Sequence, residues 1–224
     1  MEATLLENPT KDEINDIVDT LTLAFDKDPL FNCIFNCNKY SIKLLIRAYV
    51  VYFIKQGVVF VCKEKETNKI IGASIWGKKG YKELTICAIF TSLTLLWIFI
   101  RIIFRGIPSV FRLSQVSDII EKYRPNKKHI FLSIIGSNKK GGGTLLMNRA
   151  LEYFGENETL YLECSDPDVN EHFYNKFKFK MFAIETYKGI KEGFMIRIGK
   201  RQNIDEYIEN AKNREGYLFK KKIE

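Results

Sequence analysis

The sequence predicts an α/β (α+β) domain in which helices flank a sheet, and three observations support this prediction. The stretch from His129 to Phe154 has the pattern of a buried strand, a glycine-rich loop and an amphipathic helix, in that order. Two pairs of strand-like runs, 58–63 with 69–76 and 180–188 with 193–198, are each joined by a short turn, as in hairpins. Apolar residues at helical spacing fill much of the chain before these runs.

The composition indicates one folded domain. With 224 residues, 46% of them hydrophobic, the chain can bury one substantial core. The net charge of +8 is spread as single lysines rather than gathered on an arginine-rich helix, so we expect no nucleic-acid partner. The N-terminal residues lack the pattern of a signal peptide, and the five cysteines show neither a CxxC pair nor metal-ligand spacing. We therefore expect a cytoplasmic protein with reduced thiols and no bound metal.

The first third of the chain predicts helices followed by a hairpin. After a short possible strand at 4–6, Thr10 and Glu13 form a capping-box pattern at the start of a helix. The helix is then expected to end at an Asp-Pro pair in the segment AFDKDPLFNCIF. We interpret this segment as a loop whose apolar side chains pack on the end of the helix. A second helix is expected over 41–56, with Ser41 as its N-cap.

Residues 80–125 differ from the rest and predict an inserted pair of helices. The first is strongly apolar, with Arg105 in its last turn, Gly106 in the left-handed conformation and Pro108 at the start of the second. Its uncharged run 84–100 has about the minimum length that spans a bilayer, so a transmembrane helix is an alternative. Two arguments favour a buried or partner-facing helix instead. One side of the run carries hydroxyl side chains, and a membrane span would place the first hairpin and the glycine-rich loop, which should share a core, on opposite sides of the membrane.

The glycine-rich stretch predicts a binding site for an anionic group. Gly141, Gly142 and Gly143 free the backbone, and Thr144 is expected to open the following helix. Amide groups at a helix start bind anionic oxygens, which suggests a phosphate-bearing cofactor. A simple flexible turn would use three glycines equally well, so the surrounding residues must decide.

The end of the chain predicts a short strand, a brief helix, the second hairpin and a tail. The strand is expected at 160–164 and the helix in the run NEHFYNKF. Residues 1–198 then form the domain, and 199–224 form a polar, basic C-terminal tail. We interpret this tail as a surface segment with one exposed helix over 203–213.

Four stretches of the chain resemble the GNAT superfamily of acyl-CoA-dependent N-acyltransferases: AFDKDPLF, HIFLSIIGS, GGGTLLMNRALEYF and LYLECSDPDVNEHFYNKFKF. The last is the most specific, because the spacings from Glu163 to Asn170 and from Asn170 to Tyr174 fit the family pattern. The likeness extends over nearly all of residues 1–198, and one branch of the family has a similar helical insertion before a histidine-led fourth strand. The resemblance implies a mixed, mostly antiparallel sheet flanked by helices.

The resemblance further implies that acetyl-CoA is the co-substrate and lies between the fourth and fifth strands. Its pantetheine would pair with the backbone of the fourth strand, and its pyrophosphate would sit on the amides of residues 139–144. The implied cofactor-binding residues are Ile134, Ile135, Asn138, Lys139, Lys140, Gly141, Gly142, Gly143, Thr144, Asn170 and Tyr174.

Catalytic roles are implied in the same way. An amine would attack the acetyl carbonyl while a strand amide near Ile135 stabilises the oxyanion. Tyr174 would protonate the leaving thiolate, or else only pack against the fifth strand. Glu163 would take a proton from the ammonium group, or else orient its neighbours by hydrogen bonds. Neither His129 nor His172 is assigned a catalytic role.

We therefore expect an N-acetyltransferase that transfers acetyl from acetyl-CoA to a primary amine of a small molecule or peptide, by direct attack in a ternary complex. The loop GSNKKGGGT is shorter than the family pattern, only Asn138 stands where the family has glutamine or arginine, and Lys178 replaces a glycine expected to have positive φ. The alternative is a catalytically weakened interaction protein of the same fold, associated with a membrane through residues 84–104. The apolar insertion is also compatible with a homodimer.

Overall fold

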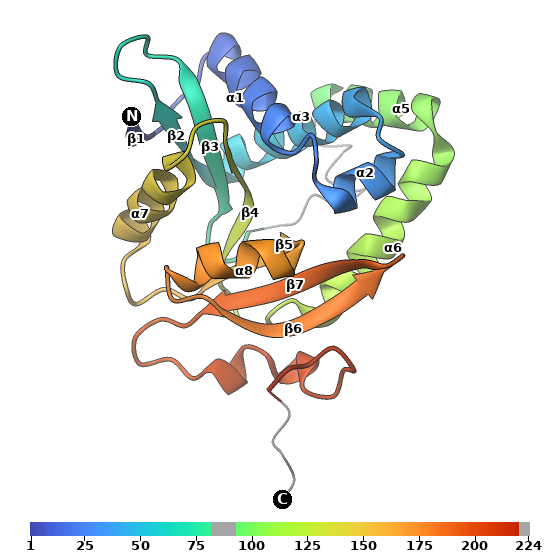
Figure 1. The fold of residues 1–224 in the computed structure, drawn as a ribbon, viewed down its shortest axis with the longest axis vertical. Coiled ribbons are helices and arrows are strands. Elements are labelled where there is room, and N and C mark those ends of the chain that lie inside the picture. The colour runs from blue at the N-terminus through green and yellow to red at the C-terminus, as the bar shows by residue number, and fades with distance from the viewer. Residues whose placement is uncertain (82–92, 220–224) are drawn as a thin grey trace, which may run out of the picture.

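The computed structural model describes residues 1–81 and 93–219, which form one sheet with helices packed against it (Figure 1). The strand order is β1-β2-β3-β4-β5-β7-β6. The strands are β1 (Glu2–Leu5), β2 (Gly57–Lys63), β3 (Ile70–Gly77), β4 (Ile130–Ser137), β5 (Leu160–Ser165), β6 (Lys180–Tyr187) and β7 (Ile190–Arg197). Neighbouring strands are antiparallel except β4 and β5, which are parallel. The predicted mixed, mostly antiparallel sheet is confirmed.

The helices bury an apolar layer on each face of the sheet. They are α1 (Lys11–Ala24), α2 (Pro29–Phe35), α3 (Lys39–Gln56), α5 (Leu93–Arg105), α6 (Ile107–Tyr123), α7 (Gly142–Phe154) and α8 (Pro167–Asn175). On β2, Val59 and Val61 belong to the core with α1 and α3, whereas Val58 and Phe60 belong to the core with α7. Successive strand residues point to opposite faces, so one strand serves both cores.

Side-chain caps set the starts of α1 and α3. The predicted capping box is confirmed, since Glu13 N–H donates to Thr10 Oγ1 at 3.2 Å and Thr10 N–H donates to Glu13 Oε2 at 3.1 Å. The predicted N-cap of the second long helix is wrong by one turn. Asn38 is the cap, because its Oδ1 accepts a hydrogen bond from Ser41 N–H at 3.1 Å.

The predicted loop after α1 is instead the short helix α2. Asp28 caps it by accepting a hydrogen bond from Phe31 N–H at 2.8 Å, and Pro29 occupies the first turn, where a missing N–H costs nothing. Of the three apolar residues of this segment expected to pack on the end of the first helix, Ile34 and Phe35 are buried and Phe31 is half-buried. The Asp-Pro pair therefore ends one helix and starts another.

The described part of the insertion forms two helices, as predicted, and the start of the predicted apolar helix lies outside the described residues. The helix α5 packs on α3 through Leu95, Ile98 and Ile102. Gly106 has φ 161°, so it is extended rather than left-handed as expected. In the described part of the chain, no single helix is long and apolar enough to cross a bilayer, whereas α5 and α6 pass that test together as a pair bent by 114°.

The segment after β7 packs against the sheet edge instead of forming the predicted exposed helix. Two short 3-10 turns, Ile204–Glu206 and Glu209–Ala211, replace that helix. The side chains of Tyr207 and Ile208 are buried, which removes apolar surface from water that a solvated helix would expose. Leu218 N–H donates to the carbonyl of Phe182 in β6 at 2.9 Å.

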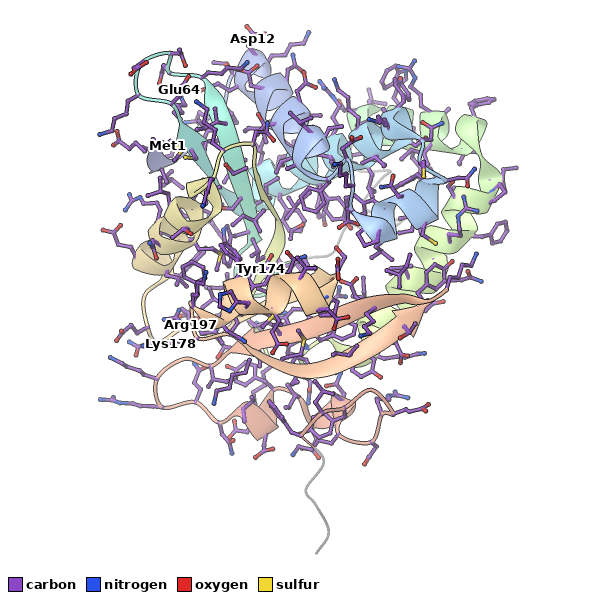
Figure 2. All side chains as sticks on the ribbon, in the orientation of Figure 1. Met1, Asp12, Glu64, Tyr174, Lys178 and Arg197 are labelled. Carbon is purple, nitrogen blue, oxygen red and sulfur yellow. The ribbon has the colours of Figure 1, made fainter. Side chains whose placement is uncertain are left out.

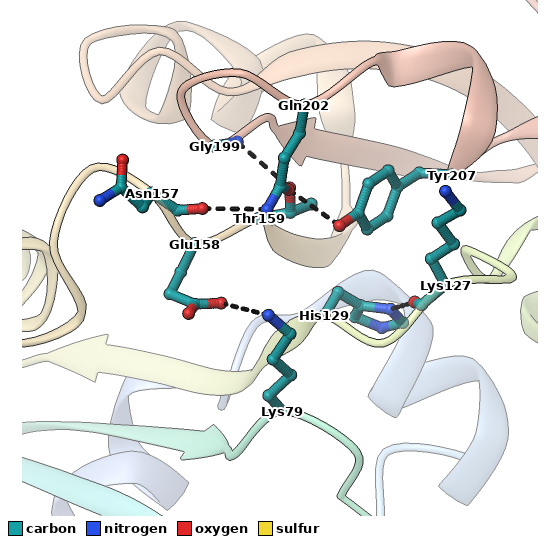
Figure 3. Close-up of polar contacts among 9 residues, drawn as sticks. All are labelled: Lys79, Lys127, His129, Asn157, Glu158, Thr159, Gly199, Gln202 and Tyr207. Carbon is teal, nitrogen blue, oxygen red and sulfur yellow. Dashed lines mark hydrogen bonds and ion pairs between the residues drawn. The ribbon is translucent and has the colours of Figure 1, made fainter.

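A polar network holds this C-terminal segment to the turn before β5 (Figure 3). Thr159 Oγ1, which is buried, accepts a hydrogen bond from Gly199 N–H at 3.1 Å. Gln202 Nε2 donates to the carbonyl of Asn157 at 3.0 Å, and Tyr207 Oη donates to Gln202 Oε1 at 2.8 Å. Because buried polar groups are costly without partners, these bonds fix the segment beside the start of β5.

Candidate active site

The strands β4 and β5 pair over only part of their length and then separate. Parallel pairing joins residues 130–132 to residues 160–162 and stops there. The ladder between β3 and β4 skips Ser133, which is the extra residue of a β-bulge. Because a bulge bends its strand, β4 turns at this residue. Ile134 and Ile135, the predicted pantetheine partners, follow the bulge directly.

A cavity of 510 Å³ lies where the two strands separate. This volume falls in the range of roughly 300–1,000 Å³ that is typical of small-ligand sites. Its walls come from β4, β5 and β7 and from α2, α3, α6 and α8, so the inserted helix α6 takes part in the site. Polar residues that line it include Asp28, Arg124, Ser133, Glu163, Ser165, Asn170, Tyr174 and Glu192.

The glycine loop enters α7 earlier than predicted. The helix begins at Gly142 rather than Thr144, with Gly141 as its N-cap at φ 88°. The amides of Gly143 and Thr144 belong to the first turn, which leaves them without intrahelical acceptors. A Cβ atom on Gly142 would lie 2.1 Å from Ser137 Oγ, so the loop packs on the end of β4 in a way that only glycine permits.

The two lysines of the loop differ in their partners. Lys139 Nζ forms an ion pair with Glu64 in the turn between β2 and β3, and this bond raises the pKa of Lys139 and lowers the pKa of Glu64. Lys140 is exposed. Asn138 N–H donates to the carbonyl of Ile71 at 2.8 Å, which extends the pairing of β4 with β3. The positive charge of the loop is therefore partly neutralised by the protein itself.

Two predicted site residues lie on α8, in the middle of the molecule, where Figure 2 labels Tyr174. Tyr174 is half-buried and lines the cavity. Burial raises the pKa of Tyr174, so its phenol is protonated at neutral pH. Asn170 Nδ2 donates to the carbonyl of Ser165 at 2.8 Å and so ties α8 to the end of β5. Lys178, in the turn after α8, has the positive φ expected there, 65°.

Glu163 faces the same cavity and has a charged partner. Its Oε1 lies 3.6 Å from Nη2 of Arg124, the C-cap residue that follows α6. Burial raises the pKa of Glu163, and the guanidinium of Arg124 opposes that effect. The motif in the sequence pointed to Glu163 but not to Arg124, because no spacing rule links an inserted helix to β5.

Besides Asp166, two further carboxyl groups line the cavity, those of Asp28 and Glu192, and no motif in the sequence marked them as site residues. Asp28 accepts a hydrogen bond from Ser165 Oγ, in addition to capping α2. Glu192 of β7 lies opposite Ser165 in the ladder with β5, is only 5% exposed, and its Oε2 has no hydrogen-bond partner among the described residues. Burial raises the pKa of both carboxyls, and the nearby Glu163 and Asp28 raise the pKa of Glu192 further. For Glu192, the signal that the sequence offered was an acidic side chain next to the apolar run of a strand.

The histidines lie outside the cavity lining described above. His129 is buried, and its Nδ1 lies 2.8 Å from the carbonyl of Lys127 (Figure 3). A carbonyl only accepts, so Nδ1 carries the proton. Burial lowers the pKa of His129 to about 4, and the ring is neutral at pH 7. His172 is exposed on α8. Among residues 1–81 and 93–219, no group of three or more His, Cys, Asp or Glu is arranged to hold a metal ion.

No protein-family model and no curated protein matches this sequence. The structure, in contrast, is similar to solved acetyltransferases. One is described as histone acetyltransferase HPA2 and related acetyltransferase, from Corynebacterium glutamicum, with a TM-score of 0.62, 17% identity, and coverage of 91% of this chain and 100% of that chain. A second is an N-acetyltransferase from Staphylococcus aureus Mu50, with a TM-score of 0.55, 17% identity, and coverage of 85% and 98%.

A third similar structure is an insect protein assigned as arylalkylamine N-acetyltransferase 7, from the yellow fever mosquito. It has a TM-score of 0.52 and 14% identity, and the match covers 87% of this chain and 86% of that chain. At these identities the comparison concerns the fold and leaves the chemistry open. The seven-stranded, mostly antiparallel sheet flanked by helices is the feature that the comparison supports. This protein has the fold of the GNAT acetyltransferases.

Proposed function

We propose that this protein is an N-acetyltransferase that transfers the acetyl group of acetyl-CoA to a primary amine of a small molecule or peptide. The observation that carries the proposal is the opening between β4 and β5. It holds a cavity lined by Tyr174 and four carboxyl groups, and the lining on β4 ends at Ser137, just before the glycine loop that leads into α7. The names of the similar structures also support acetyl transfer to an amine. We further propose that the protein acts in the cytoplasm.

Acetyl-CoA is expected to bind along the bent end of β4. Its pyrophosphate sits at the first turn of α7, where Gly143 and Thr144 offer free amides and the helix dipole favours negative charge. Its pantetheine follows the backbone near Ile134 and Ile135, while Asn170 holds the end of β5 in position. Asn138, Lys139 and Lys140 flank the pyrophosphate as further cofactor-binding residues, and Gly141 and Gly142 let the backbone approach it.

The reaction proceeds by direct attack. The substrate ammonium first loses one proton to Glu163, directly or through one water molecule, and that proton passes to solvent. The nitrogen lone pair then forms a bond to the acetyl carbon, and the carbonyl electron pair moves to oxygen, where a strand amide near Ile135 stabilises it. Collapse breaks the carbon–sulfur bond. Tyr174 protonates the leaving thiolate and regains a proton from the substrate nitrogen, so the products are an amide and CoA.

The exposed apolar face of α5 favours a second candidate function. Leu93, Trp97 and Phe104 on this helix are 87%, 53% and 86% exposed. A surface of this kind commonly contacts another protein or a membrane. The alternative is therefore an interaction protein of the same fold, with weakened catalysis, that uses the insertion to bind a membrane or a second copy of itself.

Acetyl-CoA binding separates these two functions. If the enzyme proposal is correct, millimolar acetyl-CoA raises the Tm of the purified protein, because a ligand that binds only the folded state stabilises it. Release of free thiol with a panel of amines then measures transfer. A protein whose Tm does not respond to acetyl-CoA, and which releases no thiol with any amine, is the interaction protein instead.

A further inference from the structure

We propose that the acceptor is a primary amine with an apolar body, and that Glu192, together with Asp28, binds its ammonium group. This inference rests on the proposed function, since it concerns the second substrate of the same site.

The charges of the cavity are unevenly balanced. Glu163 has the guanidinium of Arg124 at 3.6 Å. Asp28 and Glu192, in contrast, form no ion pair among the described residues, although Lys27 also lines the cavity. Burial is the main cause that raises the pKa of each, and neighbouring carboxyls raise it further. A buried carboxylate without a counter-charge is costly. A substrate cation beside them would remove this cost.

The positions of Asp28 and Glu192 suit one ammonium group. Both carboxyls adjoin Ser165, since its hydroxyl donates to Asp28 and its strand position is opposite Glu192. Residues directly opposite in an antiparallel ladder have Cβ atoms about 4.5–5.5 Å apart. An ammonium has three N–H donors, so one group can bond to both carboxyls. The unpartnered Glu192 Oε2 is an acceptor for such a donor.

The rest of the cavity is unsuited to a second charge. Much of its wall is apolar and comes from the end of α1 and from α2, α3 and α6: Phe25, Phe31, Leu45, Leu113, Val116 and Ile120. A polyamine whose first ammonium bonds to Asp28 and Glu192 would bury its second ammonium against these side chains without a partner. Asp166 lies next to Ser165, at the same end of the cavity, and Glu163 already pairs with Arg124. A hydrocarbon or aryl body would instead gain from leaving water.

The first test compares amines that differ only in their bodies. With the full-length protein and acetyl-CoA, we expect kcat/KM to rise about fourfold per methylene from butylamine to hexylamine and octylamine, until the cavity is filled. We expect 2-phenylethylamine to be a good acceptor, and 1,4-diaminobutane to be at least about tenfold poorer than butylamine. A diamine or spermidine that matches butylamine contradicts the inference.

The second test removes the proposed ammonium partner. Glu192→Gln keeps the shape of the side chain, and we expect it to raise the KM for octylamine about tenfold or more and to leave the acetyl-CoA-dependent Tm shift unchanged. Asp168→Asn is the matched control, because Asp168 is an exposed carboxylate on α8 that pairs with Lys191. An unaltered KM for octylamine in Glu192→Gln overturns the assignment of Glu192.

A third variant and a binding measurement keep the two proposals distinguishable. Leu113→Phe narrows the apolar wall and should shift the preferred alkylamine to a shorter chain, whatever the fate of the Glu192 variant. Calorimetric titration of octylamine in the presence of CoA reports the amine site without catalysis. Octylamine binding without acetyl transfer refutes the proposed function and supports the amine site. Transfer that is indifferent to chain length refutes the inference and leaves the proposed function standing.

Discussion

The two sides of the β4–β5 opening are built from different parts of the protein. On the side of α7, the proposed pyrophosphate site consists of backbone, with Gly141 as N-cap and the amides of Gly143 and Thr144 in the first turn. On the opposite side, the proposed acceptor site consists of side chains, including Asp28, Glu192 and an apolar wall from α3 and α6. The first side comes from one continuous stretch of chain, and the second comes from five or more separate segments.

This difference teaches how the two substrates would be recognised. A site made of backbone amides binds any group with the charge and shape of a phosphate, so most side-chain substitutions there should change affinity little. A side-chain site can change its preferred ligand through single substitutions, because each carboxyl or apolar residue adds its own interaction. Substitutions on the two sides should therefore differ in the size of their effects.

The strongest effect is expected where the two sides meet, at Tyr174. Tyr174→Phe removes the proposed acid but keeps the ring, so kcat should fall about 100-fold or more while the acetyl-CoA Kd stays within about twofold. Stopped-flow thiol release and calorimetry measure the two quantities. Tyr153→Phe, at an exposed tyrosine of α7, is the control. A Tyr174 variant with normal kcat would falsify its role as the acid.

The next largest effect is expected on the free energy of unfolding, when His129, which directly precedes β4, becomes protonated. The pKa of His129 is lowered to about 4, below the value of about 6.5 for an unfolded histidine, so the unfolded chain binds more protons between these values. Stability is therefore lost as pH falls through this window, by about 2 kcal/mol from pH 7 to pH 5 for this one group. Urea unfolding at both pH values measures the loss.

The variant His129→Asn should lose this share of the pH dependence, since asparagine does not titrate. His172→Asn removes the other histidine of the chain, at an exposed position, and should leave the dependence intact. If both variants retain the full loss between pH 7 and pH 5, groups other than His129 cause it.

A substitution at Gly142 tests the backbone side directly. Gly142→Ala places a Cβ 2.1 Å from Ser137 Oγ, so the loop must shift, and acetyl-CoA should bind about tenfold more weakly or worse. Gly106→Ala is the matched control, because the nearest atom to its added Cβ is 3.7 Å away and its φ is extended. Unchanged acetyl-CoA binding by the Gly142 variant would contradict a backbone cradle.

The smallest effect is expected from Lys140, the loop lysine that is exposed and forms no ion pair among the described residues. Lys140→Ala removes an exposed charge, and acetyl-CoA affinity should fall only two- to threefold at low salt and less at higher salt. Calorimetry at two ionic strengths checks this. If Lys140→Ala weakens binding as much as Gly142→Ala, side-chain charge rather than backbone determines the cofactor side.

The sequence alone predicted the elements whose signals are local. The capping box at Thr10, the two hairpins and the strand–glycine–helix order are all present, because a cap or an alternating pattern acts within a few residues. Predictions failed where tertiary packing overrode a local pattern. The polar segment 203–213 was expected to be an exposed helix. It forms short turns instead, and its Tyr207 and Ile208 side chains are buried.

The same division holds for the proposed site. The sequence by itself placed Glu163, Asn170, Tyr174 and the glycines in one short region, because their motif spans a strand, a turn and a helix in succession. Only the tertiary structure added Asp28, which meets Ser165 across 137 residues, and Arg124 and Glu192 with it. The physical reason is that burial and the pairing of charges depend on distances in the folded chain. Sequence spacing predicts such distances only within one helix, strand or turn.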